Sequence, residues 1–151
     1  MDHKIPYKDI KYFSKLVLDL IDEDEKLVPF INNFATLDNF QSQILEKRSH
    51  HLDRSLLVKV LKEQNDFLSL SEFSKENIDL LKSDSTFSVT TGHQLCMFTG
   101  PLYFIYKIIS TINLCEQLKE KYPTNNFIPV FWMASEDHDF NEINHFYLYG
   151  K

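Results

Sequence analysis

The amino-acid sequence predicts an α/β fold, in which an N-terminal helical segment over residues 1–85 precedes a strand–helix–strand unit over residues 86–151. The first observation behind this prediction is a change of composition near residue 85. Residues 1–85 contain 12 Lys/Arg, 16 Asp/Glu and no glycine, whereas residues 86–151 contain 4 Lys/Arg, 6 Asp/Glu, all three glycines and 13 of the 21 aromatic residues. The second observation is a change from helical apolar spacing to short β-branched and aromatic runs. We therefore expect solvated helices first, and then a buried core that carries a site.

The composition of the whole chain bounds the class of protein. A hydrophobic content of 43% is too high for a disordered chain, and a net charge of −6 argues against nucleic-acid or membrane partners, which need a basic surface. No apolar run approaches the ~20 residues of a membrane span, and the charged N-terminus lacks the apolar core of a secretory signal. Cys96 and Cys115 are too few for a disulfide scaffold. We expect a cytoplasmic protein in which both thiols are reduced and serve as small packing groups.

Four stretches of the first segment have the residue pattern of helices: 14–27, 37–47, 49–68 and 69–82. The third has the clearest helical period, because its leucines and valine recur every three or four residues. Ser69 and Glu72 have the spacing of a capping box, which predicts the start of the fourth helix.

The second segment begins with a predicted strand over residues 86–91, followed by a loop over 92–100. Pro101 suits the first position of a helix, where its missing N–H costs nothing, and Pro123 closes that helix. The apolar stripe of this helix is expected to comprise Leu102, Ile105, Ile109, Ile112, Cys115 and Leu118.

A near-continuous apolar run over residues 127–133 is typical of a strand that is buried in a parallel sheet. Pro129 is expected near the start of this strand or at a bulge, because it cannot donate to the ladder. The order of elements predicts a right-handed βαβ unit. Polar segments follow both strands, over residues 91–103 and 134–142, and ligands of parallel sheets bind beyond the carboxyl ends of the strands. If the two strands are neighbours, these segments converge.

The first polar segment has the chemistry of an anion site. Gly92 and Gly100 permit tight turns or a close approach to a ligand. Backbone N–H groups at the start of the following helix attract phosphate or carboxylate, and Lys107, on the face of Tyr103 at i+4, adds positive charge. The spacing matches neither common phosphate-binding motif, so ordinary turn glycines and a solvated lysine are the alternative.

The second polar segment packs three carboxylates and an imidazole together: Glu136, Asp137, His138 and Asp139. Such a group suits Mg²⁺, a substrate ammonium or proton transfer. The alternative is the start of a helix, where acidic residues are favoured. His138, and His93 in the first segment, are the candidates for acid–base chemistry near neutral pH. The His/Cys spacing of a zinc site does not occur.

Both polar segments resemble the signature motifs of the cysteine-adding enzymes of bacillithiol biosynthesis. The motif TGxQxxxFTGPLYxxxK is matched by Thr91-Gly92-His93-Gln94, then Phe98-Thr99-Gly100-Pro101-Leu102-Tyr103, and Lys107. The motif PVFWxAxEDHDFxEI is matched over residues 129–143. Two long motifs in this order make the resemblance specific, and weaker similarity extends through residues 50–85.

The resemblance implies a Rossmann-like core, which the family elaborates with inserted segments and a helical coiled-coil region. It also implies a ligase that joins the carboxyl group of cysteine to the amine of glucosaminyl malate, giving bacillithiol in the cytoplasm. Amide formation in water is uphill and requires carboxyl activation, so ATP is the expected cofactor, with Mg²⁺ as its companion ion. A homodimer is expected for the full-length proteins.

Carried onto this chain, the resemblance assigns roles to individual residues. Four residues after the second strand would handle the reacting amine: Glu136, Asp137, His138 and Asp139. Eight others would bind substrate or nucleotide: Gly92, His93, Gln94, Thr99, Gly100, Tyr103, Lys107 and Ser135. His138 is preferred to His93 as the base, because the family often has glutamine at the position of His93. No residue is assigned as a metal ligand.

Family members are several hundred residues long, so the resemblance implies either that these 151 residues are an N-terminal fragment or that another chain supplies the rest. In both cases we expect an incomplete sheet with an exposed edge. Two other functions fit the residues. One is a nucleotide-binding or nucleotidyl-transferring domain with the acidic segment on Mg²⁺, and the other is a non-catalytic scaffold whose polar loops contact a partner chain.

Overall fold

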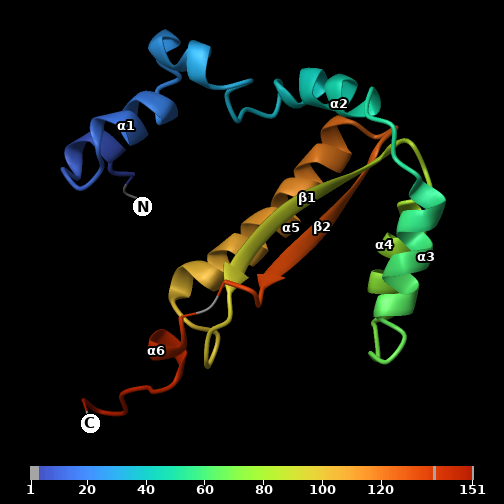
Figure 1. Ribbon diagram of the computed structural model, residues 1–151. Coiled ribbons are helices and arrows are strands. Elements are labelled where there is room, and N and C mark those ends of the chain that lie inside the picture. The colour runs from blue at the N-terminus through green and yellow to red at the C-terminus, as the bar shows by residue number, and fades with distance from the viewer. Residues whose placement is uncertain (1–3, 138, 151) are drawn as a thin grey trace. The chain divides into compact units, whose positions relative to one another are not determined.

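The computed structural model describes residues 4–137 and 139–150 of the chain (Figure 1). It divides into two compact units, Met1–Ser49 and His50–Lys151, and each unit is described by itself. Residue 85, where the composition changes, lies inside the second unit and directly precedes its first strand.

The first unit consists of short helical elements: η1 (Tyr7–Asp9), α1 (Lys15–Ile21), η2 (Glu25–Phe30) and α2 (Phe40–Arg48). The helix expected over residues 14–27 is shorter than predicted, because it ends at Ile21 and the chain then enters η2. The side chain of Asp24 caps η2 by accepting a hydrogen bond from the Lys26 N–H at 3.0 Å. One residue of the acidic stretch 22–25 therefore supplies a helix cap.

The second unit begins with two helices, α3 (Arg54–Gln64) and α4 (Glu72–Leu80). The side chain of Asp53 caps α3 by accepting from the Leu56 N–H at 2.9 Å. The capping box predicted at Ser69 is wrong: Ser71 caps α4 and accepts from the Ser74 N–H at 3.2 Å. Residues 69–70 instead belong to the α3–α4 connection, where the Leu70 N–H donates to the carbonyl of Leu68.

The predicted strand–helix–strand unit is confirmed. Strands β1 (Thr86–Gln94) and β2 (Asn126–Ala134) pair in parallel, with α5 (Leu102–Lys121) between them in sequence and packed against both. Figure 1 shows α5 alongside the two strands.

Two details of the strands differ from the sequence prediction. Strand β1 continues through residues 92–94, which were expected to form a loop, because these residues pair with Trp132, Met133 and Ala134. Pro129 lies within β2 opposite Val89, and the register runs through it without a bulge. β2 has one partner strand among the described residues, and a strand with one partner tolerates a residue without an N–H.

The buried face of α5 also differs from the predicted stripe. Cys115 and Leu118 are buried as expected, together with Thr111. The more N-terminal members of the predicted stripe are exposed: Leu102, Ile105, Ile109 and Ile112. Phe104 takes their place against the sheet, with its ring centroid 5.2 Å from that of Phe131. The least exposed row therefore follows positions 104 and 108, which are half-buried, and 111, 115 and 118, which are buried, and this spacing is also a helical period.

Two basic side chains fasten the helices to the strands. Arg54 donates to the carbonyl oxygens of Leu81 at 3.0 Å and Thr86 at 3.2 Å, and so joins the start of α3 to the start of β1. Lys119 donates to the carbonyls of Pro123 and Asn125 and so holds the turn from α5 into β2.

Within the described residues, no helix combines the length and the apolar character needed to cross a membrane.

Candidate functional site

The two polar segments leave the sheet from neighbouring positions, as the sequence predicts for adjacent parallel strands. Gln94 at the end of β1 is paired with Ala134 at the end of β2. A second contact lies beyond the strands, where the ring of Phe98 in the first segment is 5.1 Å from that of Phe146. Phe146 follows the short helix α6 (Phe140–Ile143). Residues of both motifs therefore lie at the same edge of the sheet.

The loop before α5 contains three successive residues in the left-handed region: Phe98, Thr99 and Gly100, with φ values of 50°, 67° and 58°. The N–H of Gly100 donates to the carbonyl of Met97 at 2.8 Å. A Cβ on Gly100 would lie 2.8 Å from both Cβ and Sγ of Cys96, so glycine is required here for space as well as for conformation. Left-handed non-glycine residues are costly and are concentrated at functional sites.

Gly92 is needed for a different reason, since it lies inside β1. A Cβ at this position would be 2.7 Å from the backbone oxygen of Trp132 and 3.1 Å from its Cβ. The close approach that glycine permits here is between the two strands. Gly92 therefore shapes the sheet immediately before the strand ends, and does so through its lack of a side chain.

His93 is the most constrained side chain of the first segment. Its Nδ1 lies 2.9 Å from the carbonyl oxygen of Gln94, and its Nε2 lies 3.0 Å from the hydroxyl of Tyr103. The imidazole also contacts the ring of Phe104, with centroids 5.6 Å apart. Both ring nitrogens are thus engaged, which leaves neither free to take a proton directly from a substrate.

Lys107 lies on the same face of α5 as Tyr103, as their spacing predicts. Its Nζ is 6.0 Å from the centroid of the Tyr103 ring. Lys107, Tyr103 and His93 therefore form a continuous group at the N-terminal end of α5, directly beside the end of β1. The positive charge of the lysine and the N–H groups of the helix start give this side of the site an attraction for anions.

The second segment turns immediately after β2. The Ser135 N–H donates to the carbonyl of Met133 at 2.8 Å, and the Asp137 N–H lies 3.4 Å from the carbonyl of Ala134. The side chains of Glu136 and Asp137 are exposed in this turn. His138, the preferred base, lies outside the described residues.

Asp139 stabilises the start of the helix that follows the acidic turn. Its side chain accepts a hydrogen bond from the Asn141 N–H at 2.8 Å and caps α6. The alternative interpretation of the acidic segment as a helix start thus applies to Asp139. In the part of the chain that the structure describes, no three His, Cys, Asp or Glu side chains gather as they would around a metal ion.

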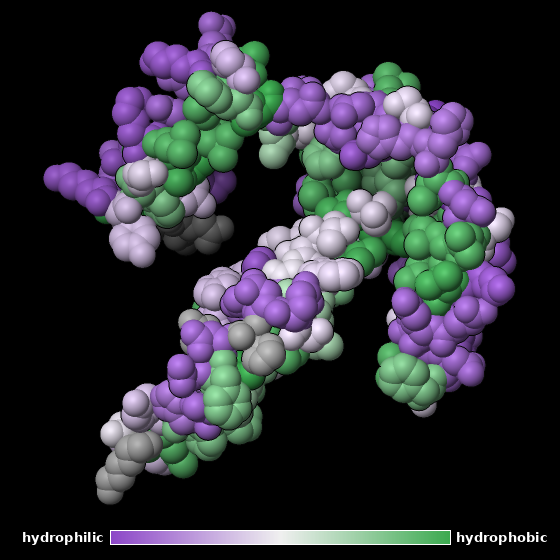
Figure 2. Space-filling model, in the orientation of Figure 1, coloured by the Kyte–Doolittle hydropathy of each residue, from purple (hydrophilic) through white to green (hydrophobic). Residues whose placement is uncertain are grey.

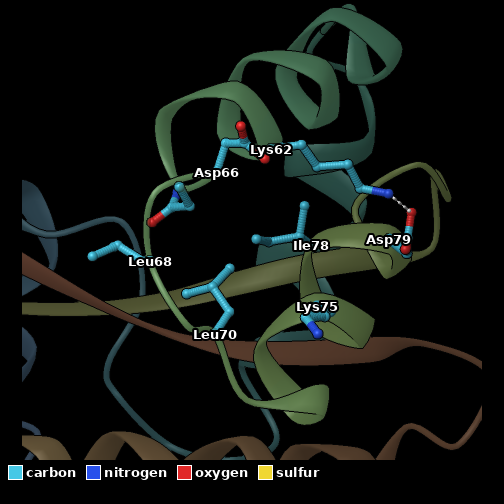
Figure 3. Close-up of a pocket in the computed structure, with 8 residues that line it drawn as sticks. Lys62, Asp66, Leu68, Leu70, Lys75, Ile78 and Asp79 are labelled. Atoms are coloured by element: carbon cyan, nitrogen blue, oxygen red, sulfur yellow. Dashed lines mark hydrogen bonds and ion pairs between the residues drawn. The ribbon is translucent and has the colours of Figure 1, made fainter.

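Sequence reasoning did not identify a cavity of about 340 Å³ that lies between α3 and α4 (Figure 3). It is lined by Lys62, Asn65, Asp66, Leu68, Leu70, Lys75, Ile78 and Asp79. Lys62 donates to Asp79 at 2.8 Å across this cavity, and Lys82 donates to the same carboxylate at 2.9 Å. These two hydrogen bonds lower the pKa of Asp79 below its usual value. The pair of Lys62 and Asp79 thus joins α3 to α4, whereas Lys82 follows α4 in the sequence. Figure 2 shows a hydrophobic patch bordered by hydrophilic side chains on this hairpin.

The two cysteines differ in exposure. Cys115 is buried in α5, and burial raises the pKa of its thiol to about 11, with the nearby charge of Glu116 acting in the same direction. This thiol is a packing group, as expected from the sequence. Cys96 is half-buried in the loop before α5, against Gly100.

A parallel strand–helix–strand unit, with polar motifs at both strand ends, belongs to the α/β class of the Rossmann-like type, and the described residues form a two-stranded sheet. The chain belongs to the family described as bacillithiol biosynthesis BshC, N-terminal Rossmann-like domain, whose family model matches residues 2–151. The resemblance carried by the two motifs is thereby confirmed.

Individual relatives agree with the family match. The chain is 53% identical over 149 residues to a Flavobacterium johnsoniae protein, and 54% identical over 149 residues to one from Christiangramia forsetii. In each case the match covers 97% of this chain and 28% of the relative. A Chlorobaculum tepidum protein is 36% identical over 145 residues, which are 93% of this chain and 26% of that protein. All three relatives are named "Putative cysteine ligase BshC". The chain thus spans less than a third of the length of these relatives.

Proposed function

We propose that this domain forms part of a ligase that joins cysteine to glucosaminyl malate through an amide bond in the last step of bacillithiol biosynthesis, in the cytoplasm. The observation that carries the proposal is the pairing of Gln94 with Ala134, from which both motif segments leave the same edge of the sheet. Family membership and the name of the relatives support the class of reaction. The other parts of the full-length protein would complete the site.

The acidic side of the site suits the amino group of a reactant. Glu136 and Asp137 are exposed acidic residues in the turn after β2. Exposed carboxylates at this position would attract the ammonium group of cysteine or the amine of the sugar. Asp139 contributes through the start of α6, which it caps, and Ser135 adds a hydroxyl to the same turn.

The basic side of the site suits an anion. The N-terminal end of α5, together with Lys107, offers N–H groups and a positive charge, and Thr99 and Gly100 form the loop that leads into it. These donors fit a phosphate of ATP or a carboxylate of glucosaminyl malate. When bound, ATP would supply the activation of the carboxyl group that amide formation requires. Mg²⁺ would accompany the phosphates of ATP, and the exposed carboxylates of Glu136 and Asp137 would offer it a protein ligand.

We assign to His138 the role of the base that accepts the proton of the attacking amine. Its neighbour Asp137 lies in the exposed turn after β2, at the edge of the sheet where the reactants would meet. His93 is less suited to this role, because both of its ring nitrogens are occupied by Gln94 and Tyr103.

The test uses the full-length protein with cysteine, glucosaminyl malate and ATP, and measures bacillithiol by mass spectrometry. Asp137→Asn and His138→Ala should each lower the rate about 100-fold or more while leaving the thermal unfolding midpoint unchanged. Asp84→Asn is the matched control, because Asp84 is a fully exposed carboxylate that precedes β1 and so lies at the opposite end of this strand from the two motif segments. Near-normal formation of bacillithiol by both site variants would refute the assignment of the acidic segment. Calorimetric titration with ATP, with and without Mg²⁺, tests whether ATP is the activating cofactor. The absence of binding heat in both titrations would refute this role of ATP.

A further inference from the structure

The hydrogen bonds of His93 fix the direction in which Tyr103 can interact with a ligand. The Gln94 carbonyl oxygen can only accept, so the proton of the neutral imidazole is on Nδ1. The Nε2 atom, 3.0 Å from the Tyr103 hydroxyl, then carries a lone pair and accepts the phenolic proton. The oxygen of Tyr103 is left with its lone pairs and no free proton.

Tyr103 is exposed enough to contact a ligand. Its residue is 54% exposed, whereas His93 is half-buried beneath it and packs on Phe104. The half-buried imidazole is therefore held by Gln94 and Phe104, whereas more than half of the surface of Tyr103 is open to solvent. An acceptor held in one orientation selects ligand groups that donate a hydrogen bond.

The charge of Lys107 limits which ligand groups could donate a hydrogen bond to Tyr103. Its Nζ lies 6.0 Å from the centroid of the Tyr103 ring, and a positive charge at this distance disfavours an ammonium group on the ligand. A neutral hydroxyl, on a molecule that also carries carboxylates for the lysine, meets both requirements. Glucosaminyl malate has sugar hydroxyls and two carboxylates, whereas cysteine has no hydroxyl group. The amino groups of both reactants suit the acidic turn after β2.

We propose that Tyr103 binds a hydroxyl group of glucosaminyl malate through its phenolic oxygen, and that His93 is a positioning residue that acts only through Tyr103. This inference rests on the proposed function for the identity of the ligand. The polarity of the His93–Tyr103 pair rests on the hydrogen bonds alone.

A double-mutant cycle in the full-length protein tests the pair. Tyr103→Phe should raise KM for glucosaminyl malate about tenfold, as expected for one lost hydrogen bond, and change KM for cysteine less than about twofold. His93→Leu should raise the same KM by a similar factor, and the double variant should be no worse than Tyr103→Phe alone. His93→Gln keeps an acceptor near the position of Nε2 and should restore most of the affinity. Tyr106→Phe is the control, since Tyr106 is an exposed tyrosine one turn further along α5.

Independent effects of the two substitutions, or a rise in KM for cysteine in place of glucosaminyl malate, would overturn the proposal. Calorimetric binding of glucosaminyl malate to the same variants gives the answer without turnover. If wild-type protein binds the sugar with the expected dependence on Tyr103 but forms no amide, the proposed function fails and this inference stands. If the wild-type protein forms bacillithiol but Tyr103→Phe binds glucosaminyl malate normally, the proposed function stands and this inference fails.

A spectroscopic measurement separates positioning from a merely structural role. In protein labelled with ¹⁵N-histidine, the His93 imidazole should show the tautomer with the proton on Nδ1, and its signals are identified by their loss in His93→Gln. The tautomer with the proton on Nε2 would reverse the polarity of Tyr103 and refute the proposal.

Discussion

Gly92 and Trp132 lie opposite each other in the two parallel strands, and the backbone oxygen of Trp132 is 2.7 Å from the position that a Cβ on residue 92 would occupy. Since the obstacle is backbone, a side-chain rotation cannot relieve it. Gly92→Ala should therefore separate the strand ends and lower the free energy of unfolding by about 1–3 kcal/mol, as overpacking does. Chemical denaturation measures this loss.

The control for Gly92→Ala is Thr90→Ala, two residues earlier on the same face of β1, where the side chain is exposed. The control should change stability by less than about 0.5 kcal/mol. Equal stability of the two variants would contradict the close approach of the strands. A loss of activity in Gly92→Ala with full stability would instead point to a direct role of Gly92 in the site.

Gly100 and Gly150 form a natural pair for a second prediction, because both have left-handed φ values, 58° and 75°. A Cβ at position 100 would lie 2.8 Å from Cys96, whereas nothing lies within 4 Å of one at position 150. Both valine variants carry the backbone strain, so their difference isolates crowding. Gly100→Val should be less stable than Gly150→Val by about 1–3 kcal/mol in thermal or chemical unfolding. Equal tolerance would mean that the loop before α5 can relax.

The sequence predicts the strand–helix–strand unit well because its signals are local. Runs of β-branched and aromatic residues, and prolines at both ends of the helix, act over a few neighbouring positions. The end of β1 could not be predicted in this way. Residues 92–94 have the composition of a loop, and they are extended because Trp132 and its neighbours pair with them. The choice between two apolar rows on α5 likewise depended on how the helix sits on the sheet, which placed Phe104 against Phe131.

The convergence of the two polar segments could be predicted from the sequence, but the contacts within the candidate site could not. Adjacent parallel strands bring their following segments together, and this requires only the order of elements. The hydrogen bond between His93 and Tyr103 joins a strand to a helix across ten positions of sequence, and no periodic pattern reports it. The cap that Asp139 forms on α6 was visible as an alternative, but the choice required the geometry.

Arg54 provides a third prediction, because it donates to two backbone carbonyls and also lies 3.2 Å from the carboxylate of Asp84. The Arg54 side chain is 19% exposed and that of Asp84 is fully exposed, so the carbonyl contacts should carry most of the stability. Arg54→Lys cannot reproduce the forked geometry and should destabilise the protein by about 2 kcal/mol. Asp84→Asn should cost less than about 0.5 kcal/mol. A larger loss for Asp84→Asn than for Arg54→Lys in urea unfolding would show that the ion pair dominates.

Asp79 gives the α3–α4 hairpin a dependence on pH. Hydrogen bonds from Lys62, and then from Lys82, lower the pKa of Asp79 in the folded state. A lowered pKa means that the contribution to stability is present above the unfolded value of 3.8 and is lost as the pH falls through the lower folded value. Hydrogen exchange of α4 amides should therefore show faster opening below about pH 4, and Asp79→Asn should remove this part of the pH dependence. Asp66→Asn is the control at the same cavity, and an identical pH profile for wild type and Asp79→Asn would contradict the prediction.

The two thiols should react at very different rates. Cys115 is 5% exposed and its pKa is raised to about 11, so little thiolate exists at pH 8 and access to it requires opening of α5 from the sheet. Cys96 is half-buried in the loop before α5, where local motion suffices to expose it. Iodoacetamide at pH 8 should therefore modify Cys96 first, and peptide mass spectrometry should find Cys115 modified only when denaturant is added. Because the pKa of Cys115 is raised on folding, its thiol form contributes stability that is fully present below the unfolded value of 9.0 and is lost as the pH rises towards 11. Cys115→Ala should abolish this alkaline loss, and rapid alkylation of Cys115 in native protein would show that α5 separates readily from the strands.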